Sequence, residues 1–328
     1  MKEINILITA IGGDIGSNII NILNAQEGVK FNVYGTDINE KNYSTDVVHK
    51  FYKVDRVSSK NYGKQIINII RENSIEFIIP VAEMEIIWFN DNLNLFSELN
   101  THILINKANI VKTFLNKLET SKILLSMKIK TPQTIELNKF NEEIDYPIII
   151  KSKFSIYGKD LYIVKNRQQL ENIKNTLKNY EHYIVQEYIG TIEDEYTTTV
   201  YKDKSSLEVI TFKRKLTGGM TSFAEIRDEK ILKNYAKIIA TKLDLYGSIN
   251  IQSRKVGNDF YIFEINPRFS STIYIRNNFN FHDLIWWINS FNKEKLCKID
   301  YSNKVEKSGY AILGYKYKFF KGDDNENR

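Results

Sequence analysis

Alternation between short apolar runs and helical periodicity in the first hundred residues most constrains the fold. Residues 5–10 are apolar enough for a buried strand, residues 12–16 predict a tight glycine turn, and residues 17–24 place apolar side chains at helical spacing. Further strand-like runs occupy residues 31–34, 51–54, 77–81 and 103–105, and a helical pattern occupies residues 62–72. Strands that alternate with helices predict a doubly wound, mostly parallel α/β sheet.

The pattern changes after residue 107. A helix-rich connector is expected to residue 127, and Thr131-Pro132 predicts the start of a new element because proline disfavours helix before it. Strand-like runs then dominate, at residues 148–151, 161–164, 183–186, 196–201, 207–212, 249–254, 260–266 and 310–317, with helices near residues 168–179 and 229–243. This second part is expected to be α+β, with antiparallel strands, and the polar end of the chain is expected to fray.

Composition narrows the class of protein. A chain of 328 residues exceeds what one core usually supports, so several domains are expected. The net charge is +6, but the Lys and Arg residues are spread along the chain and interrupted by Asp and Glu, which argues against a nucleic-acid partner. The densest basic group, Lys204, Lys213, Arg214 and Lys215, is either a solvated strand edge or a contact for a small anion.

Targeting and redox features point to the cytoplasm. The single cysteine, Cys297, excludes an intrachain disulfide. The N-terminus has the pattern of a strand and loop rather than of a signal peptide, and no apolar run approaches the ~18 to 20 residues needed to cross a bilayer. A cytoplasmic protein without a membrane partner is expected.

The glycine turn at residues 11–16 has two interpretations. With Asp37 at the end of the second strand it matches a dinucleotide fingerprint, which favours an NAD-dependent oxidoreductase. The same glycines also serve a tight strand-to-helix turn without any cofactor, and such short motifs often match by chance.

The run Phe263-Glu-Ile-Asn-Pro-Arg268 carries the strongest chemical signal. On a strand, Glu264, Asn266 and Arg268 share one face, and Phe263 and Ile265 are expected to face the core. Carboxylate and amide oxygens suit magnesium shared with substrate phosphates. The alternative is a solvated Glu264–Arg268 pair.

A hairpin would bring Gln252 into the same group. If Gln252 lies opposite Glu264, a three-residue loop of Gly257, Asn258 and Asp259 joins the strands. A two-residue loop would instead place Gln252 on the face of Phe263, and the group of oxygen donors would not form.

Other polar residues stand at the ends of predicted strands. Lys151 and Lys153 leave an apolar strand before the loop 154–158, which suits phosphate binding. Gln186, Glu187, Tyr188 and Ile189 lie where a strand runs into a turn, a place where backbone groups can pair with an adenine edge, and Glu195 follows as a candidate ribose ligand. Glu83 and Glu85, in the first domain, either face the pocket of an acceptor substrate or are solvated.

In this order the motifs resemble those of the ATP-grasp superfamily, in particular the short relatives of the carbamoyl phosphate synthase large chain, over residues 1–289. The resemblance implies that Lys117 and Lys151 bind phosphates, that Glu187 and Ile189 offer backbone groups to adenine, and that Glu195 binds ribose. It implies magnesium ligands at Gln252, Glu264 and Asn266. Arg268 would steady the transferred phosphoryl group, and Arg214 with Gly218-Gly219 would lie near the acceptor.

The resemblance also implies an organisation and an activity. Residues 1–106 would form an N-terminal α/β domain, residues 107–190 the connector and small ATP-grasp subdomain, residues 191–295 the large subdomain with the metal site, and residues 296–328 a final strand and tail. The expected activity is that of an ATP-dependent carboxylate–amine ligase that uses one or two Mg²⁺, or Mn²⁺, with small-molecule substrates and a possible homodimer. The alternatives are the oxidoreductase and a non-catalytic ATP-binding module.

Overall fold

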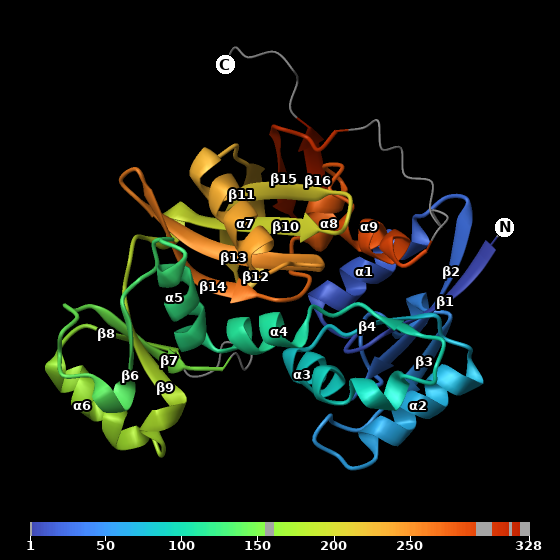
Figure 1. Cartoon of the computed structure of the whole chain (residues 1–328), viewed down its shortest axis with the longest axis horizontal. Helices are drawn as coiled ribbons and strands as arrows, with labels where there is room; N and C mark the ends of the chain where they lie inside the picture. Colours follow the sequence, from blue (N-terminus) through green and yellow to red (C-terminus); the bar gives the residue numbers. More distant parts are fainter. Residues whose placement is uncertain (1, 155–160, 293–303, 315–316, 322–328) are drawn as a thin grey trace.

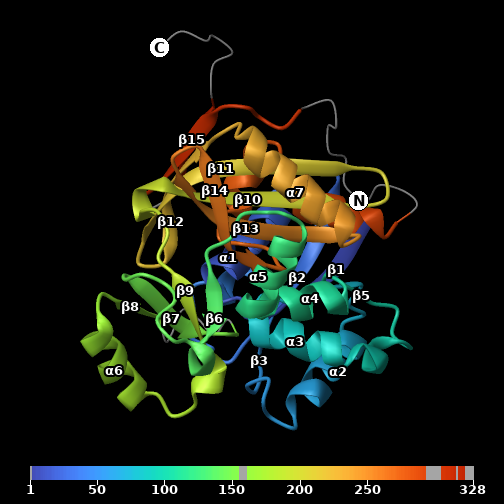
Figure 2. The same cartoon turned by 60° about the vertical axis from the view of Figure 1, so that its left-hand side comes forward.

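The computed structural model describes residues 2–154, 161–292, 304–314 and 317–321, and it contains three β-sheets (Figure 1). Most of the predicted phosphate loop, Cys297 and part of the predicted strand 310–317 lie outside the described residues. The two views in Figures 1 and 2 show the N-terminal sheet and a small sheet as separate lobes below a large sheet.

The N-terminal sheet is parallel, as the alternating pattern predicts. Its strand order is β3-β2-β1-β4-β5. The strands are β1 (Lys2–Ile8), β2 (Val29–Asp37), β3 (Lys50–Lys53), β4 (Phe77–Ile79) and β5 (His102–Ile103), and the helices are α1 (Asp14–Asn24), α2 (Tyr62–Glu72) and α3 (Glu83–Asp91). On the central strand, Ile6 and Ile8 pack with α1 whereas Leu7 packs with α2 and α3. Helices therefore cover both faces.

A pair of helices connects this sheet to the rest of the chain. They are α4 (Ala108–Leu115) and α5 (Lys117–Ser126). Asn116 separates them and caps α5, because its side-chain oxygen accepts bonds from the N–H groups of Leu118 and Glu119 at 3.0 and 3.3 Å. The cap fixes the position of Lys117 as the first residue of α5.

A small antiparallel sheet follows, with strand order β6-β9-β7-β8. Its elements are β6 (Thr134–Glu136), β7 (Ile148–Ser152), β8 (Leu161–Val164), α6 (Arg167–Thr176) and β9 (Tyr183–Glu187). It has a hydrophobic core of its own, which includes Ile148, Ile150, Leu170 and Val185.

The large sheet has the strand order β14-β13-β10-β11-β12-β15-β16, and each neighbouring pair is antiparallel. The strands are β10 (Glu195–Lys202), β11 (Leu207–Thr217), β12 (Met220–Ile226), β13 (Gly247–Val256), β14 (Asp259–Asn266), β15 (Gly309–Leu313) and β16 (Tyr317–Lys321), with helices α7 (Lys230–Lys242), α8 (Ile273–Asn277) and α9 (Asp283–Ser290). Strand β12 was not expected, because Thr221, Ser222 and Glu225 interrupt its apolar pattern.

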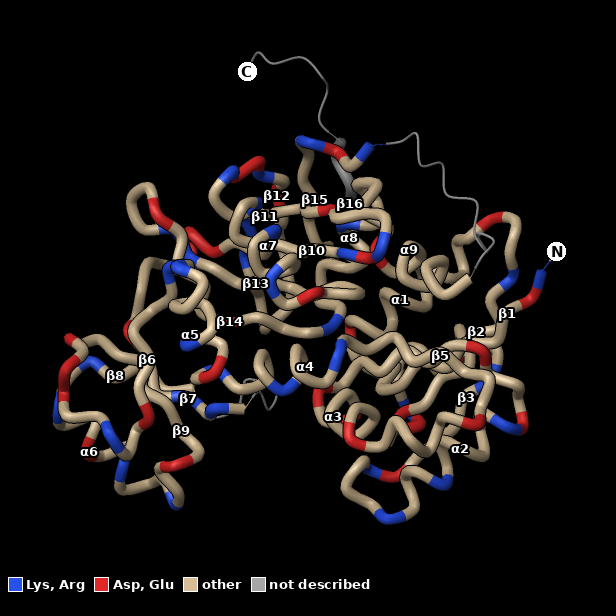
Figure 3. Tube along the Cα trace, in the orientation of Figure 1, with Lys and Arg blue, Asp and Glu red and all other residues tan. Residues whose placement is uncertain are grey.

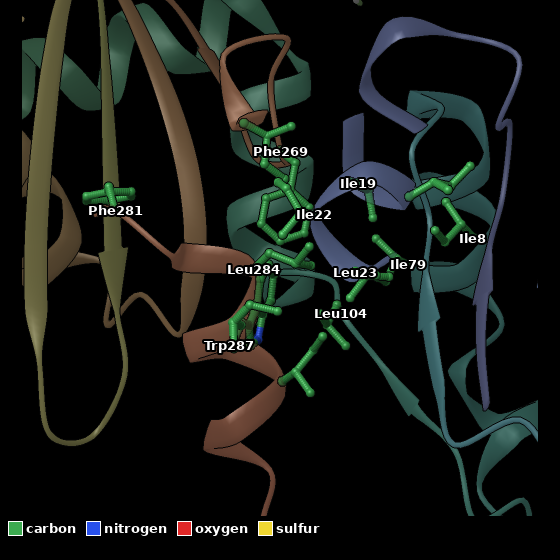
Figure 4. Close-up of a cluster of buried hydrophobic side chains, with 14 of the residues drawn as sticks. Ile8, Ile19, Ile22, Leu23, Ile79, Leu104, Phe269, Phe281, Leu284 and Trp287 are labelled. Carbon is green, nitrogen blue, oxygen red and sulfur yellow. The ribbon is translucent and has the colours of Figure 1, made fainter. Parts of the chain in front are cut away.

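One hydrophobic cluster joins the N-terminal sheet to the large sheet. Figure 4 shows Ile19, Ile22 and Leu23 of α1 facing Leu284 and Trp287 of α9. The same cluster continues into Ile6 and Ile8 on one side and into β10 and β11 on the other. These two sheets therefore share a core, whereas the small sheet does not belong to it.

Lys and Arg are interspersed with Asp and Glu along the chain trace in Figure 3. Among the described residues, every helix is too short or too polar to span a lipid bilayer.

Candidate active site

A cleft of about 1080 Å³ lies where the three sheets meet. The N-terminal sheet and its loops contribute residues 12–15, Asp37 and residues 81–85, and the small sheet contributes Ile149, Lys151 and Gln186. From the large sheet come Asn250, Gln252, Arg254, Phe263, Glu264, Asn266 and Arg214, and Arg268 follows the end of β14. Most of the residues singled out in the sequence therefore line one cavity.

The β13–β14 hairpin has the predicted register but reaches it differently. Gln252 is opposite Glu264, as expected, yet Val256 pairs with Asp259, so the loop has two residues instead of three. The register shifts between Gln252 and Ser253, which leaves Phe263 as the extra residue of a β-bulge. The expectation that a two-residue loop would misplace Gln252 was wrong, because the extra residue of the bulge replaces the residue that is missing from the loop and keeps Gln252 opposite Glu264.

The bulge also changes the direction of Phe263. Ile262 and Ile265 are both buried in the core, whereas Phe263 and Glu264 both line the cleft. The prediction that Phe263 faces the core was wrong, because the bulge interrupts the alternation of faces along β14. The ring of Phe263 lies 5.8 Å from Lys151 Nζ and 5.6 Å from Arg254 Cζ, measured to its centroid.

The oxygen donors share one face of the large sheet. Gln252 opposes Glu264 and Asn250 opposes Asn266, and all four line the cleft. Asn250 is held by the neighbouring strand β10, because its Oδ1 accepts a bond from Thr197 Oγ1 at 2.7 Å. The structure thus brings together the three predicted metal ligands, with a second buried amide beside them.

Glu264 stays ionised in this surrounding. Burial alone would raise the pKa of its carboxyl group, but nearby cations more than offset this and lower the pKa below its ordinary value. In order of effect these cations are Lys117, Lys151, Arg268 and Arg214. A carboxylate that stays charged among cations is suited to binding a divalent ion.

Lys117 and Lys151 are buried cations at the cleft. They are 8% and 6% exposed, and they come from α5 and β7. Burial lowers the pKa of Lys151 to about 8; Glu264 opposes this shift, while Lys117 and Arg254 add to it. Two buried ammonium groups that line the same cleft are suited to binding phosphate oxygens.

Lys153 is not among the residues that line the cleft. Its Nζ lies 2.6 Å from Glu136 Oε1, and its side chain is 12% exposed. Lys139 and Lys153 lower the pKa of Glu136 to about 2. Lys153 nevertheless shapes the site through its backbone, since Lys117 N–H donates to Lys153 O at 2.8 Å.

The predicted base-binding segment borders the cleft at Gln186, Glu187 and Ile189, but Tyr188 does not. Gln186 is 2% exposed, and its Nε2 donates to Thr134 Oγ1 at 2.9 Å. Glu187 is tied to Gln133 in both directions, through its N–H at 2.9 Å and its carboxylate at 3.2 Å. The end of β9 is therefore a rigid edge of the cleft.

Glu195 lies behind the cleft wall, not on it. It is 7% exposed and does not line the cavity. Its Oε1 accepts a bond from Arg214 Nη2 at 3.0 Å, and its Oε2 accepts bonds from Arg254 at 3.3 and 3.4 Å. Arg214 is 5% exposed, so the basic group seen in the sequence is not a solvated edge at this position.

Arg268 reaches across to the N-terminal domain. Its Nη2 donates to Glu83 Oε1 at 2.8 Å, and its Nη1 donates to Phe269 O at 3.0 Å. Glu83 and Glu85 both line the cleft, which favours the pocket interpretation over solvated carboxylates. Glu85 is buried, which raises the pKa of its carboxyl group, and it accepts bonds from Thr9 Oγ1 at 2.6 Å and Tyr62 OH at 2.8 Å.

The glycine turn is closed by its own acidic residue. Asp37 Oδ2 accepts a bond from Gly12 N–H at 2.8 Å, and Asp37 Oδ1 accepts one from Asn39 N–H at 2.9 Å. A Cβ atom on Gly12 would lie 2.9 Å from Asp37 Oδ2. The turn donor and the carboxylate that a dinucleotide would need are therefore bonded to each other, which favours the interpretation of these glycines as a tight turn.

Sequence reasoning missed several residues of the site. Arg254, Asn250 and Thr134 were given no role and Phe263 was placed in the core, although Arg254 and Asn250 alternate with Gln252 on the same strand. That alternation was an available signal for two of them. The bulge that exposes Phe263 and the contact between Thr134 and Gln186 had none.

Two family models match the chain. One, described as an ATP-grasp domain, matches residues 114–272, and the other, described as a PylC-like N-terminal domain, matches residues 6–104. The first range includes both buried lysines and all three predicted metal ligands. The second range covers the parallel sheet.

Curated relatives are similar at low identity. Formate-dependent phosphoribosylglycinamide formyltransferase of Sulfurisphaera tokodaii is 26% identical over 240 residues, which are 63% of this chain and 59% of the relative. The carbamoyl phosphate synthase large chain of Thermoplasma volcanium is 25% identical over 235 residues, 62% of this chain and 22% of the relative. The chain thus covers less than two thirds of either relative.

Solved structures match over most of the chain. N5-carboxyaminoimidazole synthetase of Staphylococcus aureus, complexed with ADP, has a TM-score of 0.74 at 16% identity and covers 95% of this chain and 83% of its own. The biotin carboxylase domain of the Hydrogenobacter thermophilus 2-oxoglutarate carboxylase, in complex with MgADP and bicarbonate, has a TM-score of 0.70 at 15% identity, with coverage of 94% and 73%. At such identities the likeness concerns the fold.

Proposed function

Because residues 114–272 match an ATP-grasp domain, we propose that the chain uses ATP and Mg²⁺ to activate a carboxylate as an acyl phosphate and to join it to an amine or ammonia. One observation carries the proposal. Gln252, Glu264 and Asn266 lie near one another on two paired strands and line a cleft that Lys117 and Lys151 also line.

The similar proteins support this chemistry by what their names describe. One acts with formate, two structures contain ADP or MgADP, and one of these also contains bicarbonate. Formate and bicarbonate both present a carboxylate-type oxygen to a phosphoryl donor. We therefore propose a small carboxylate and a small amine as the substrates of this chain.

The donor set fits a magnesium ion. Glu264 would supply a charged oxygen, and Gln252 and Asn266 would supply amide oxygens, which leaves coordination positions for phosphate oxygens and water. Among the described residues no group of three or more His, Cys, Asp or Glu side chains could hold a metal without such help. This agrees with a metal bound jointly by protein and nucleotide. When bound, Mg²⁺ would neutralise charge on the phosphates.

The base site favours adenine. Thr134 Oγ1 must donate its proton to Pro132 O, 2.9 Å away, because a carbonyl oxygen can only accept. Thr134 can then only accept from Gln186, so the Gln186 amide turns its NH₂ group toward Thr134. The Gln186 oxygen is left for the cleft, where it suits the amino group of adenine and opposes the carbonyl oxygen of guanine.

The reaction needs positioned charges and no side-chain nucleophile. A carboxylate oxygen attacks the γ-phosphorus of ATP, and the bond to the β,γ-bridging oxygen breaks to release ADP. The amine nitrogen then attacks the acyl carbon, phosphate leaves and the nitrogen loses a proton. Lys117, Lys151 and Arg268 would bind the charge of the transferred group in both steps.

Domain roles follow as part of the same proposal. Residues 107–190 would bind the base and the phosphates from one side, residues 191–295 would supply the metal ligands, and residues 1–106 would border the acceptor. The number of metal ions, the use of Mn²⁺, the role of the segment 296–328 and a homodimer stay predictions.

The test is acyl phosphate formation by the full chain. Pairs of carboxylic acids and amines are screened for ADP release, and hydroxylamine is added to trap the acyl phosphate as a hydroxamate. We expect Mg²⁺-dependent ADP release with one class of acid, and we expect Glu264→Gln to abolish it while Glu27→Gln, an exposed control, retains it.

Two outcomes would count against the proposal. ATP binding without hydroxamate across a broad acid screen would indicate a non-catalytic module. Normal ADP release by Glu264→Gln would refute the metal assignment.

A further inference from the structure

A fully buried ion pair lies behind the segment 267–272, which follows β14. Arg276 of α8 is 0% exposed, and Asp283 of α9 is 1% exposed. Arg276 Nε donates to Asp283 Oδ1 at 2.9 Å, and Arg276 Nη2 donates to Asp283 Oδ2 at 2.7 Å. Ser248 Oγ, on β13, donates to the same carboxylate at 2.6 Å. The pair therefore joins the two helices to the large sheet.

The other terminal nitrogen of Arg276 holds two hydroxyl groups of this segment. Arg276 Nη1 donates to Ser270 Oγ at 3.2 Å and to Thr272 Oγ1 at 3.3 Å, and the two hydroxyl oxygens lie 2.9 Å apart. Thr272 is 0% exposed and does not line the cleft, whereas Ser270 is 5% exposed and does. One hydroxyl is thus enclosed in the interior, and the other borders the ligand space.

The number of protons fixes the direction of the hydrogen bond between the two hydroxyls. Arg276 only donates, so neither hydroxyl gives its proton to it. Among the hydrogen bonds of the described residues, Ser270 Oγ is the one acceptor for the buried Thr272 proton. A buried hydroxyl without an acceptor costs free energy, so Thr272 donates to Ser270. Both lone pairs of Ser270 Oγ are then used, and its own proton is left for a ligand in the cleft.

The segment 267–272 is also held at its start. Asn106 is 1% exposed, and its Nδ2 donates to Pro267 O at 3.0 Å. Arg268 pairs with Glu83 at 2.8 Å, which places this part of the cleft wall beside the N-terminal domain. Ser270 follows Arg268 by two residues, and both line the cleft. A fixed hydroxyl donor near a guanidinium group suits an anionic oxygen.

We infer that Arg276 is a positioning residue for the proposed reaction and that, through Ser270, it directs a hydrogen-bond donor at an anionic oxygen of the reacting group. The inference rests on the proposed function and deepens it, since this oxygen belongs to the substrate carboxylate or to the transferred phosphoryl group. Asp283 holds Arg276, and Thr272 completes the polarity of Ser270. Burial of an ion pair costs desolvation energy that apolar residues avoid, so stability alone is a weak reason for this pair.

The experiment separates binding of the anion from binding of the nucleotide. The full chain is saturated with MgADP, and calorimetry measures dissociation constants for acetate, which represents the carboxylate, and for inorganic phosphate, which represents the transferred group. The variants are Ser270→Ala, Thr272→Val, the combination of these two, Arg276→Lys and the paired replacement Arg276→Met/Asp283→Leu. Thr176→Val, at an exposed threonine of α6, is the matched control. Circular dichroism checks that each variant folds.

Ser270→Ala is expected to weaken binding of at least one anion about tenfold, the effect of one hydrogen bond to a charged oxygen, and to leave the dissociation constant of MgADP within about twofold. Thr272→Val should weaken binding of the same anion about threefold alone and not at all in the Ser270→Ala background, because Thr272 acts through Ser270. The paired replacement should match Ser270→Ala. Arg276→Lys keeps a charged donor beside Asp283 and should retain part of the affinity that the paired replacement loses.

A loss with acetate assigns the donor to the carboxylate, and a loss with phosphate assigns it to the transferred group. Unchanged affinity for both anions in Ser270→Ala overturns the inference, and so does a cost of Thr272→Val that persists without the Ser270 hydroxyl. If the paired replacement does not fold, these two single variants still decide. A wild-type protein that binds MgADP but neither anion also overturns the inference, whereas one that does not bind MgADP refutes the proposed function as well.

Discussion

Lys151 is a buried cation whose charge depends on pH near neutrality. Its pKa is lowered to about 8, with burial as the largest cause, so the free protein loses this charge as the pH rises through 8. A bound triphosphate favours the charged form and raises that pKa. ATP binding above pH 8 should therefore take up a proton, and affinity should fall as the pH rises from 8 to 9.5.

Calorimetry in two buffers of different ionisation enthalpy measures this proton uptake. Lys151→Arg provides the control, because a guanidinium stays charged throughout this range and should remove the pH dependence. A wild-type affinity that is constant between pH 7 and 9.5 would contradict the assigned role of Lys151.

Thr134 is expected to set base selectivity without touching the base. Thr134→Val removes the acceptor that orients the Gln186 amide, so the amide can turn and present its NH₂ group to a guanine oxygen. We expect the preference for ATP over GTP to fall about tenfold, the cost of one misplaced hydrogen bond. The ratio of dissociation constants for the two nucleotides measures it, with Thr176→Val on the exposed face of α6 as the control. An unchanged ratio would show that Gln186 does not read the base.

At the scale of elements, the bulge in β14 can be tested by removing it. Deletion of Phe263 should leave Ile262 opposite Ser253 and Glu264 opposite Gln252, because the bulged residue has no partner in the ladder. The variant should fold and keep Mg²⁺-dependent binding, but ATP affinity should fall about tenfold because the ring beside Lys151 and Arg254 is lost.

Circular dichroism and nucleotide titration check this prediction, with Phe263→Ala as the comparison. Both variants should lose similar affinity. If the deletion abolishes Mg²⁺-dependent binding while Phe263→Ala keeps it, the ladder has slipped and the register argument is wrong.

This hairpin also illustrates what could be predicted from the sequence. The alternation of Glu264 and Asn266, and their pairing with Gln252, follow from the two-residue period of a strand. The bulge adds one residue to β14, and no sequence signal indicates it. The predicted loop length and the predicted direction of Phe263 were therefore wrong, whereas the predicted register was right. The predicted loop was one residue too long and the predicted strand β14 lacked the one-residue bulge, so the two errors cancelled in the register.

Long-range pairing explains the remaining differences. Nothing near Lys153 in the sequence indicates that Glu136, on a strand two positions away in the sheet, would pair with it. Likewise, Glu195 meets Arg254 only because β10 and β13 are neighbours. Periodicity predicts which face a side chain takes, but charge pairing across strands depends on sheet order, which the sequence pattern left open.

For the whole molecule, the distribution of hydrophobic cores determines which parts unfold together. The cluster that joins α1 to α9 makes the N-terminal and large sheets one body, and the small sheet has its own core. The cleft lies between these two bodies, and its wall on the small sheet carries Lys151 and Gln186. The phosphate and base contacts can therefore open by local unfolding of the small sheet while the metal ligands stay in place.

Truncation of one leucine in each core tests this division. Leu23 and Leu170 are each 1% exposed, the first in the shared core and the second in the core of the small sheet. Each change to alanine should lower the free energy of unfolding of the body that contains the leucine by about 2 to 5 kcal/mol, the usual range for a buried leucine. Leu23→Ala should lower hydrogen-exchange protection in both β1 and β13, whereas Leu170→Ala should lower it only within residues 134–187. Unchanged protection of β13 in Leu23→Ala would mean that the two sheets unfold independently, and the shared cluster would then not couple the acceptor side of the cleft to its metal ligands.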